Sequence, residues 1–163
     1  MGEADKAYER ALRFLEKRDR TEKEVTDKLT DAGFSETAVT KTVNRLREDG
    51  YVNDEAYAVR YLDALENKGR GRIRIASEMR RKGLGEDLVR NTLEDNVSSA
   101  DEKERAREAA KRAFGQIADK TDMRKVKAKV NRRLVTLGYS YNVIGEVINQ
   151  LGNEESYDYD DED

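Results

Sequence analysis

The sequence contains no cysteine, no histidine and no proline. The absence of cysteine excludes disulfide bonds, thiolate nucleophiles and thiolate metal sites. The absence of histidine removes the commonest metal ligand and the commonest general base. A phosphate-binding G-x-x-x-x-G-K-[ST] loop is also missing, because Gly69 and Gly71 lack its spacing. We therefore predict no catalytic residue, no metal and no cofactor, and we expect a protein that is not an enzyme.

Long apolar runs are absent as well. No run approaches the roughly 20 apolar residues that cross a bilayer, and the first ten residues are too polar for a secretory signal. We expect a cytoplasmic protein without a membrane partner. Hydrophobic residues make up 36% of the chain and charged residues 41%, against about 45–50% and about 25% in average domains. This composition favours small units with thin cores.

The chain contains three copies of one sequence motif. Its first two apolar residues are four positions apart, so they share one face of a helix. A glycine follows, as is typical after a helix end, and Ser35, Gly85 or Ser140 then takes the N-cap position of a second helix. The seven motif positions are Val25, Leu29, Gly33, Phe34, Val39, Val43 and Leu46 in the first copy, Ile75, Met79, Gly83, Leu84, Val89, Leu93 and Asn96 in the second, and Val130, Leu134, Gly138, Tyr139, Ile144, Ile148 and Leu151 in the third.

A further amphipathic helix is predicted before the two helices of each motif copy, over residues 4–18, 54–68 and 100–118. No segment alternates apolar and polar residues at period two, so no sheet is expected. One three-helix unit buries little surface alone, and neighbouring units should therefore stack. The predicted fold is all-α, with three tandem three-helix repeats stacked into an elongated, curved array. The predicted boundaries are residues 1–50, 51–97 and 98–152, followed by an acidic disordered tail over residues 153–163.

The net charge of −3 conceals an uneven distribution of charge along the chain. Residues 97–150 contain 12 Lys and Arg against 7 Asp and Glu, whereas residues 151–163 contain none against 7. The acidic end is interpreted either as a solubilising tail or as a competitor for the basic part of the chain.

Cations on the middle helices of the second and third repeats are spaced so as to form rows on the polar face. The rows comprise Arg70, Arg74, Ser77 and Arg81 in the second repeat and Lys125, Lys129, Arg132 and Thr136 in the third. The aligned row of the first repeat, Arg20, Glu24, Asp27 and Asp31, is mostly acidic. Two interpretations stay open: a solvated helix face with local ion pairs, or a docking surface for nucleic-acid phosphate or an acidic protein groove.

An ordered series of short motifs resembles the RecX family over residues 4–151. An Asp–Gly pair, an apolar pair and an Asp lead into a helix with a Tyr-Ala pair, and a basic stretch between two Lys–Gly pairs follows. These residues are Asp49, Gly50, Tyr51, Val52, Asp54, Tyr57 and Ala58, and then Lys68, Gly69, Arg72, Ile73, Met79, Lys82, Gly83 and Leu84.

The resemblance implies a regulator of recombination, DNA repair and the SOS response. Members of this family lie in the groove of RecA filaments on DNA and inhibit their recombinase, ATPase and co-protease activities, and they bind DNA weakly without sequence specificity. Nothing in the sequence demands a dimer, so a monomer is expected. The predicted contacts to the filament or DNA are Arg70, Arg72, Arg74, Arg81, Lys125, Lys129 and Arg132.

Two other functions fit the sequence. Residues 21–52 resemble a helix-turn-helix transcriptional regulator, in which Lys41, Asn44 and Arg45 would lie on the exposed side of the recognition helix. Residues 51–54 lead directly into a new helix, however, and leave no hairpin for a wing. The other possibility is a helical protein–protein adaptor without a nucleic-acid partner, for which the basic rows would be incidental.

Overall fold

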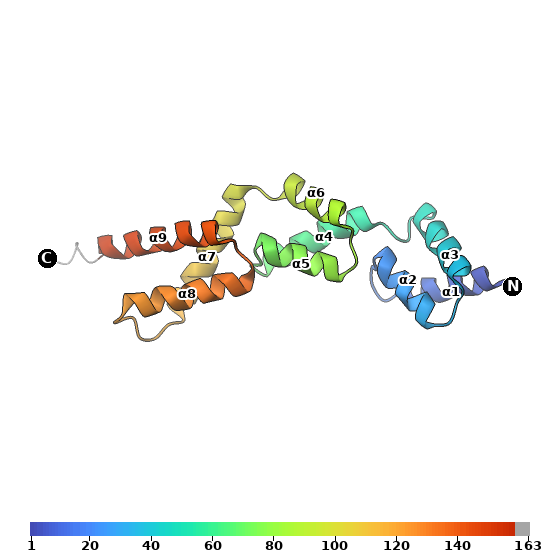
Figure 1. Ribbon diagram of the computed structural model, residues 1–163, viewed down its shortest axis with the longest axis horizontal. Coiled ribbons are helices and arrows are strands. Elements are labelled where there is room, and N and C mark those ends of the chain that lie inside the picture. Colours follow the sequence, from blue (N-terminus) through green and yellow to red (C-terminus); the bar gives the residue numbers. More distant parts are fainter. Residues whose placement is uncertain (159–163) are drawn as a thin grey trace. The chain divides into compact units, whose positions relative to one another are not determined.

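The computed structural model describes residues 1–158, with side chains up to residue 154. Within these residues the regular structure consists of nine α-helices without a strand, which confirms the predicted all-α class (Figure 1). No helix in this part of the chain combines the length and the apolar character that crossing a membrane requires.

The first repeat forms a three-helix bundle from α1 (Glu3–Leu15), α2 (Glu22–Asp31) and α3 (Glu36–Glu48). The Thr21 hydroxyl accepts a hydrogen bond from the backbone N of Glu24 and so caps α2. The Ser35 hydroxyl caps α3 in the same way, as predicted. The core contains the predicted apolar positions together with two alanines of α1. Its buried residues are Ala7, Ala11, Val25, Leu29, Val39, Val43, Leu46 and Val52.

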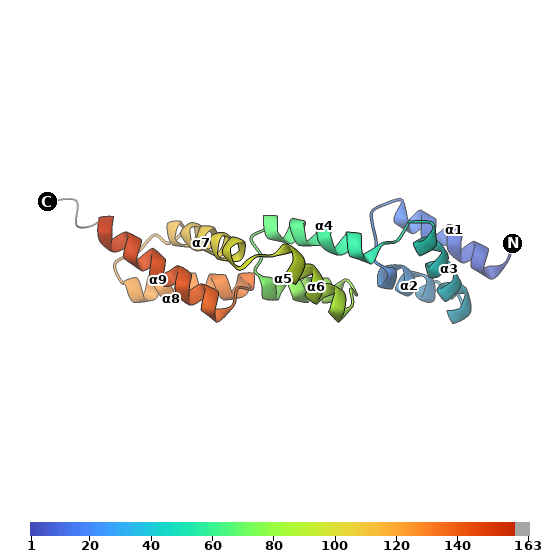
Figure 2. The same cartoon turned by 90° about the horizontal axis from the view of Figure 1, so that it is seen from above.

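The third repeat forms a second bundle from α7 (Ser99–Gly115), α8 (Met123–Leu137) and α9 (Tyr141–Asp158), which lie side by side in Figures 1 and 2. The core side chains of α7 are alanines, which contribute little volume and let the larger side chains of α8 and α9 approach closely. The buried residues are Ala106, Ala109, Ala110, Val130, Leu134, Leu137, Tyr139, Val143, Ile144 and Val147.

The middle repeat consists of α4 (Asp54–Asn67), α5 (Arg72–Arg81) and α6 (Glu86–Asn96). The chain divides into two compact units, and each of these three helices passes from one unit to the other. The first unit contains Met1–Tyr61 and Glu78–Thr92, and the second contains Leu62–Ser77 and the chain from Leu93 onward. The predicted boundaries of the three repeats therefore stay a prediction.

The motif glycines that follow α2, α5 and α8 adopt left-handed backbone conformations. Gly33, Gly83 and Gly138 have φ angles of +91°, +84° and +94°, which only glycine adopts without strain. The helix–glycine turn–helix unit predicted from the sequence is therefore present in all three copies. Helix α9 extends beyond residue 152, where the third repeat was predicted to end, and reaches Asp158. Residues 159–163 of the predicted tail lie outside the described residues.

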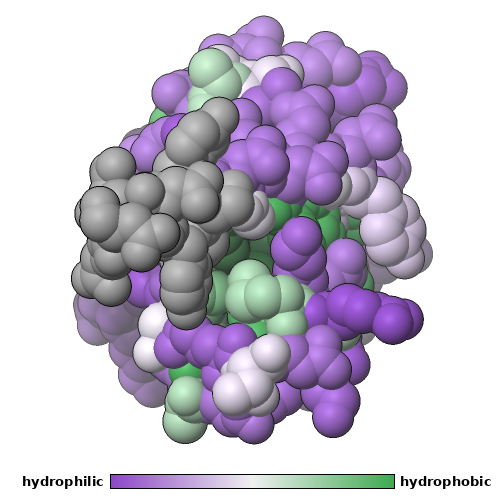
Figure 3. Space-filling model, turned by 90° about the vertical axis from the view of Figure 1, so that its left-hand side faces the viewer, coloured by the Kyte–Doolittle hydropathy of each residue, from purple (hydrophilic) through white to green (hydrophobic). Residues whose placement is uncertain are grey.

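An apolar hollow lies in the third bundle, where the end of α7 faces the first turns of α8 and the later turns of α9. It is lined by Phe114, Met123, Val126, Lys127, Val130, Ile148, Leu151 and Gly152. Figure 3 shows a hollow of apolar residues that hydrophilic residues surround.

Within the second unit, the start of α5 packs backbone to backbone against the turn between α8 and α9. The backbone N of Gly71 donates a hydrogen bond of 2.7 Å to Leu137, and the backbone N of Ile73 donates one of 3.0 Å to Gly138. A Cβ atom on Gly71 would lie 2.4 Å from the carbonyl oxygen of Gly138. This approach therefore excludes a side chain at position 71.

We predict that Gly71→Ala lowers the free energy of unfolding by roughly 1–3 kcal/mol, because the methyl group forces two backbone segments apart. Gly145→Ala is the control, since a Cβ atom there meets open space within α9. The control should raise stability by about 0.5–1 kcal/mol through helix propensity. Urea unfolding followed by circular dichroism measures both variants, and equal stability of the two would contradict the close approach.

Candidate partner-binding surface

The cations predicted in the third repeat lie together on α8. Lys125, Lys129 and Arg132 are exposed, whereas Val126 and Val130 on the opposite side of the helix are buried in the bundle. The spacing of four and seven residues places the three cations along one face. None of the three has an ion pair within 4.0 Å among the residues that the structure describes. Their charges are therefore available to a partner.

One loop carboxylate lies close enough to this row to interact with it electrostatically. The hydroxyl and the backbone N of Thr121 both donate hydrogen bonds to Asp119, and they lower the pKa of that carboxyl. The charge of Lys129 adds a smaller lowering of the same pKa. Asp119 therefore stays ionised at neutral pH and reduces the positive potential at one end of the row.

The cations predicted in the second repeat differ in exposure. Arg70 lies before α5 and not on it, because its backbone N donates to the carbonyl of Leu65 and so completes the C-terminal turn of α4. The predicted helical row is wrong at this position. Arg74 lies on α5 and is half-buried, with its backbone close to Gly138. Arg81 is the last residue of α5 and is exposed.

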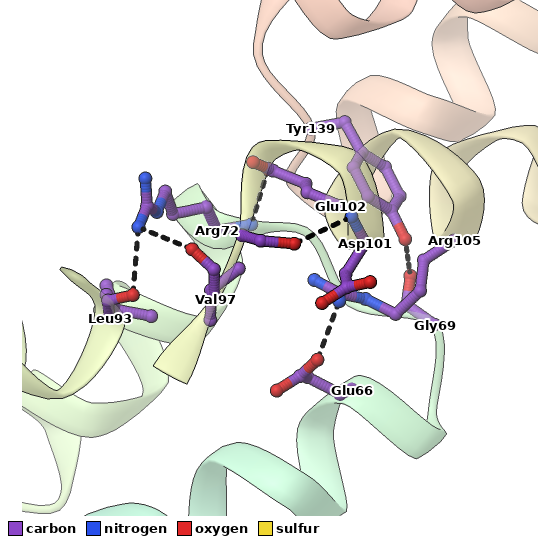
Figure 4. A network of polar contacts seen from close by, with 10 residues as sticks. Glu66, Gly69, Arg72, Leu93, Val97, Asp101, Glu102, Arg105 and Tyr139 are labelled. Carbon is purple, nitrogen blue, oxygen red and sulfur yellow. Dashed lines mark hydrogen bonds and ion pairs between the residues drawn. The ribbon is translucent and has the colours of Figure 1, made fainter. Parts of the chain in front are cut away.

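Arg72 uses its side chain inside the protein. Its Nη2 donates hydrogen bonds of 2.9 Å to the carbonyl of Leu93 and 3.5 Å to that of Val97, and its backbone N donates to Glu102 (Figure 4). These carbonyls belong to the last turn of α6 and the residue after it, where a helix leaves acceptors unpaired. A structural role in the second unit therefore accounts for Arg72 without an external partner.

Two further contacts join α4 to the third bundle in the same region (Figure 4). Arg105 forms a 2.6 Å ion pair with Glu66. The side chain of Arg105 is only 16% exposed and that of Glu66 only 21%. The Tyr139 hydroxyl donates a 2.7 Å hydrogen bond to the carbonyl of Gly69. Burial raises the pKa of Glu66, although the positive charge of Arg105 opposes this, and burial raises the pKa of the Tyr139 phenol. The contacts hold the segment from Gly69 to Arg72 in place.

Sequence reasoning missed a cavity lined by cations in the second unit. Its volume is about 190 Å³, and its lining residues are Lys68, Gly69, Ala109, Arg112, Ala113, Gln116, Arg133 and Leu137. The three cations come from the turn after α4, from α7 and from α8, so no spacing along one helix could reveal them. A shallower hollow of the first unit, lined by Arg10, Arg13, Phe14, Glu16, Lys17 and Lys28, was also missed.

The exposed side of α3, which the helix-turn-helix hypothesis assigns to DNA, makes contacts within the first unit. Arg45 lies 3.8 Å from the ring centroid of Tyr8 and approaches Asp5 and Asp49 at 3.9 and 3.7 Å. Asn44 accepts a hydrogen bond from Arg47, which also pairs with Glu22. Of the three residues that the helix-turn-helix hypothesis assigns to DNA, only Lys41 is left as an exposed cation without such a contact. This arrangement does not favour recognition of bases in a DNA duplex by α3.

Comparison with known proteins decides the family. The pattern for the first three-helix domain of RecX matches residues 7–46, and that for the second three-helix domain matches residues 53–93. The regulatory protein RecX of Clostridium perfringens is 37% identical over 147 residues, which cover 89% of this chain and 68% of that protein. The chain belongs to the RecX family.

The similarity to RecX proteins extends beyond the two matched domains. RecX of Clostridium botulinum is 32% identical over 155 residues, which cover 94% of this chain and 72% of that protein. The crystal structure of RecX from Lactobacillus salivarius superposes with a TM-score of 0.83 at 26% identity, over 92% of this chain and 97% of that one. The helical repeat array predicted from the sequence is thus a RecX fold.

We predict that Tyr139→Phe lowers the free energy of unfolding by about 1 kcal/mol, because the carbonyl of Gly69 loses its donor in a partly buried place. Tyr141→Phe is the control, because Tyr141 is 81% exposed. Hydrogen exchange should also show faster exchange at Gly71 and Ile73 in the first variant. Unchanged stability and exchange would mean that this hydrogen bond does not hold the segment.

Proposed function

We propose that this RecX protein binds RecA filaments on DNA and inhibits their recombinase, ATPase and co-protease activities. The observation that carries the proposal is the row of exposed cations on α8, in a chain whose relatives are named regulatory proteins. The anionic partner would be an acidic wall of the filament groove or the phosphates of the enclosed DNA. Weak DNA binding without sequence preference belongs to the same proposal, as do a monomeric state and a cytoplasmic location.

Cations on a solvent-exposed helix act collectively. A single exposed charge contributes on the order of 0–1 kcal/mol to an interaction. Several like charges on one face raise the local potential and accelerate association with an anionic surface, and salt weakens this effect. Lys125, Lys129 and Arg132 would supply this attraction on α8, and Arg81 would be a separate contact on the first unit. Binding to the filament should therefore weaken as ionic strength rises.

Inhibition follows from occupation of the groove. Three-helix units in tandem would contact successive subunits of a filament and hold them in one arrangement, because a packed helical bundle deforms little. A protein lodged there would exclude incoming DNA and would restrain the subunit movements that accompany ATP hydrolysis. The proposal needs no catalytic group on this chain itself.

We predict that replacing Lys125, Lys129 and Arg132 by Glu raises the concentration needed to inhibit DNA-dependent ATP hydrolysis by RecA by roughly tenfold or more, because three attractions become repulsions. Helicity should be retained, because all three side chains are exposed and have no ion pair in the described part of the chain. Steady-state ATPase assays with RecA on single-stranded DNA measure the effect.

The matched control replaces three other exposed cations, Lys6, Lys41 and Lys111, by Glu. It makes the same change in net charge and should keep inhibition within a few fold of the unaltered protein. Equal inhibition by the two triple variants would show that α8 is not the contact surface. Loss of binding to one particular duplex sequence on changing Lys41 alone would instead support a transcriptional regulator.

A further inference from the structure

The cation-lined cavity of the second unit lies on the small side chains of α7. Ala109 and Ala113 are one turn apart on this helix, and their methyl groups leave open the space that a larger residue would fill. Leu137, the last residue of α8, is buried and closes the cavity at the core. The alanine-rich sequence of α7 thus produces both the close packing of the bundle and this hollow.

Among the residues that the structure describes, three cations and no carboxylate line this cavity. Lys68, Arg112 and Arg133 are exposed, and none of them forms an ion pair or a side-chain hydrogen bond with another described residue. A neighbouring hollow between Asp119, Asp122, Lys125 and Lys129 contains equal numbers of acids and bases. The contrast indicates that the first cavity attracts anions, because uncompensated cations around a concave surface concentrate positive potential.

The walls of the cavity are held by the contacts described above. Lys68 and Gly69 form the turn after α4, and the Tyr139 hydroxyl fixes this turn by donating to the carbonyl of Gly69 (Figure 4). Arg112 and Arg133 come from two helices of one packed bundle. The three charges therefore converge on one place without a large loss of backbone freedom when a ligand binds.

We propose that this cavity is a phosphate site that takes one phosphate of a nucleic-acid strand. Guanidinium groups bind phosphate oxygens through paired hydrogen bonds, and a lysine adds a point charge. A volume of about 190 Å³ is several times the ~30 Å³ of one water molecule, so a phosphate group fits with its first waters. The proposal deepens the DNA contact included in the proposed function.

A nucleic-acid strand fits this site better than a free nucleotide. No aromatic side chain from the described part of the chain lines the cavity, so a base would find no surface there on which to stack. Lys129 lies one turn before Arg133 on α8, and Lys125 lies one turn before Lys129. A strand with one phosphate in the cavity would place its next phosphates along this row, and its sequence would not be read.

The test compares the double variant Arg112→Gln, Arg133→Gln with the control Lys6→Gln, Lys111→Gln in the full chain. Both remove two exposed cations without changing a described ion pair. Fluorescence anisotropy with a single-stranded oligonucleotide should show roughly tenfold weaker binding for the first variant, since two charged hydrogen-bond donors are lost. The slope of log affinity against log salt concentration should become shallower by about 0.7, the value for one phosphate contact on a single strand.

Two outcomes overturn the site. Equal affinity of the two double variants would show that the cavity does not hold a phosphate, and absence of oligonucleotide binding by the unaltered protein would do the same. Inhibition of RecA can persist in either case, so the proposed function is tested separately by its ATPase assay. Titrations followed by NMR, one with inorganic phosphate and one with the oligonucleotide, identify the source of the ligand. The amide signal of Gly69 should shift only weakly with phosphate and strongly with the oligonucleotide. The amide signal of Gly145 is the control and should shift with neither.

Discussion

The second unit depends on a close contact between two stretches of backbone. Gly71 approaches the carbonyl of Gly138, and the amides at positions 71 and 73 donate to the turn after α8. Backbone hydrogen bonds of this kind fix position and direction together, because donor and acceptor are both part of the main chain. A chain with so few apolar residues has only thin cores. The backbone contact therefore fixes the position of α5 against the turn after α8 more firmly than burial of apolar side chains alone would.

Polar side chains complete this contact. Arg105 with Glu66, Tyr139 with Gly69 and Arg72 with the end of α6 satisfy groups that lie partly out of water. Removing one partner of such a pair costs more than the pair itself contributes, because the remaining group stays desolvated. The network therefore favours one arrangement of the helices around the cavity, and the cations of the cavity come together as a result.

The charged surface combines two kinds of cation. Some are used within the protein: Arg72 binds carbonyl groups, and Arg45 lies against Tyr8 between two aspartates. Others, such as Lys125 and Arg133, are exposed and unpaired within the described residues. Composition and net charge do not separate the two kinds. The distinction decides which cations can serve a partner, since a cation already engaged must lose its own contacts first.

The sequence alone determined the all-α class, the three copies of the helix–glycine turn–helix motif, and the cap at Ser35. These features depend on residues a few positions apart, and local geometry decides them. It also indicated the RecX family and the exposed row on α8. The tertiary structure alone decided that Arg72 is internal and that Lys68, Arg112 and Arg133 share a cavity. Those facts join residues up to 65 positions apart, which only the packing of separate helices brings together.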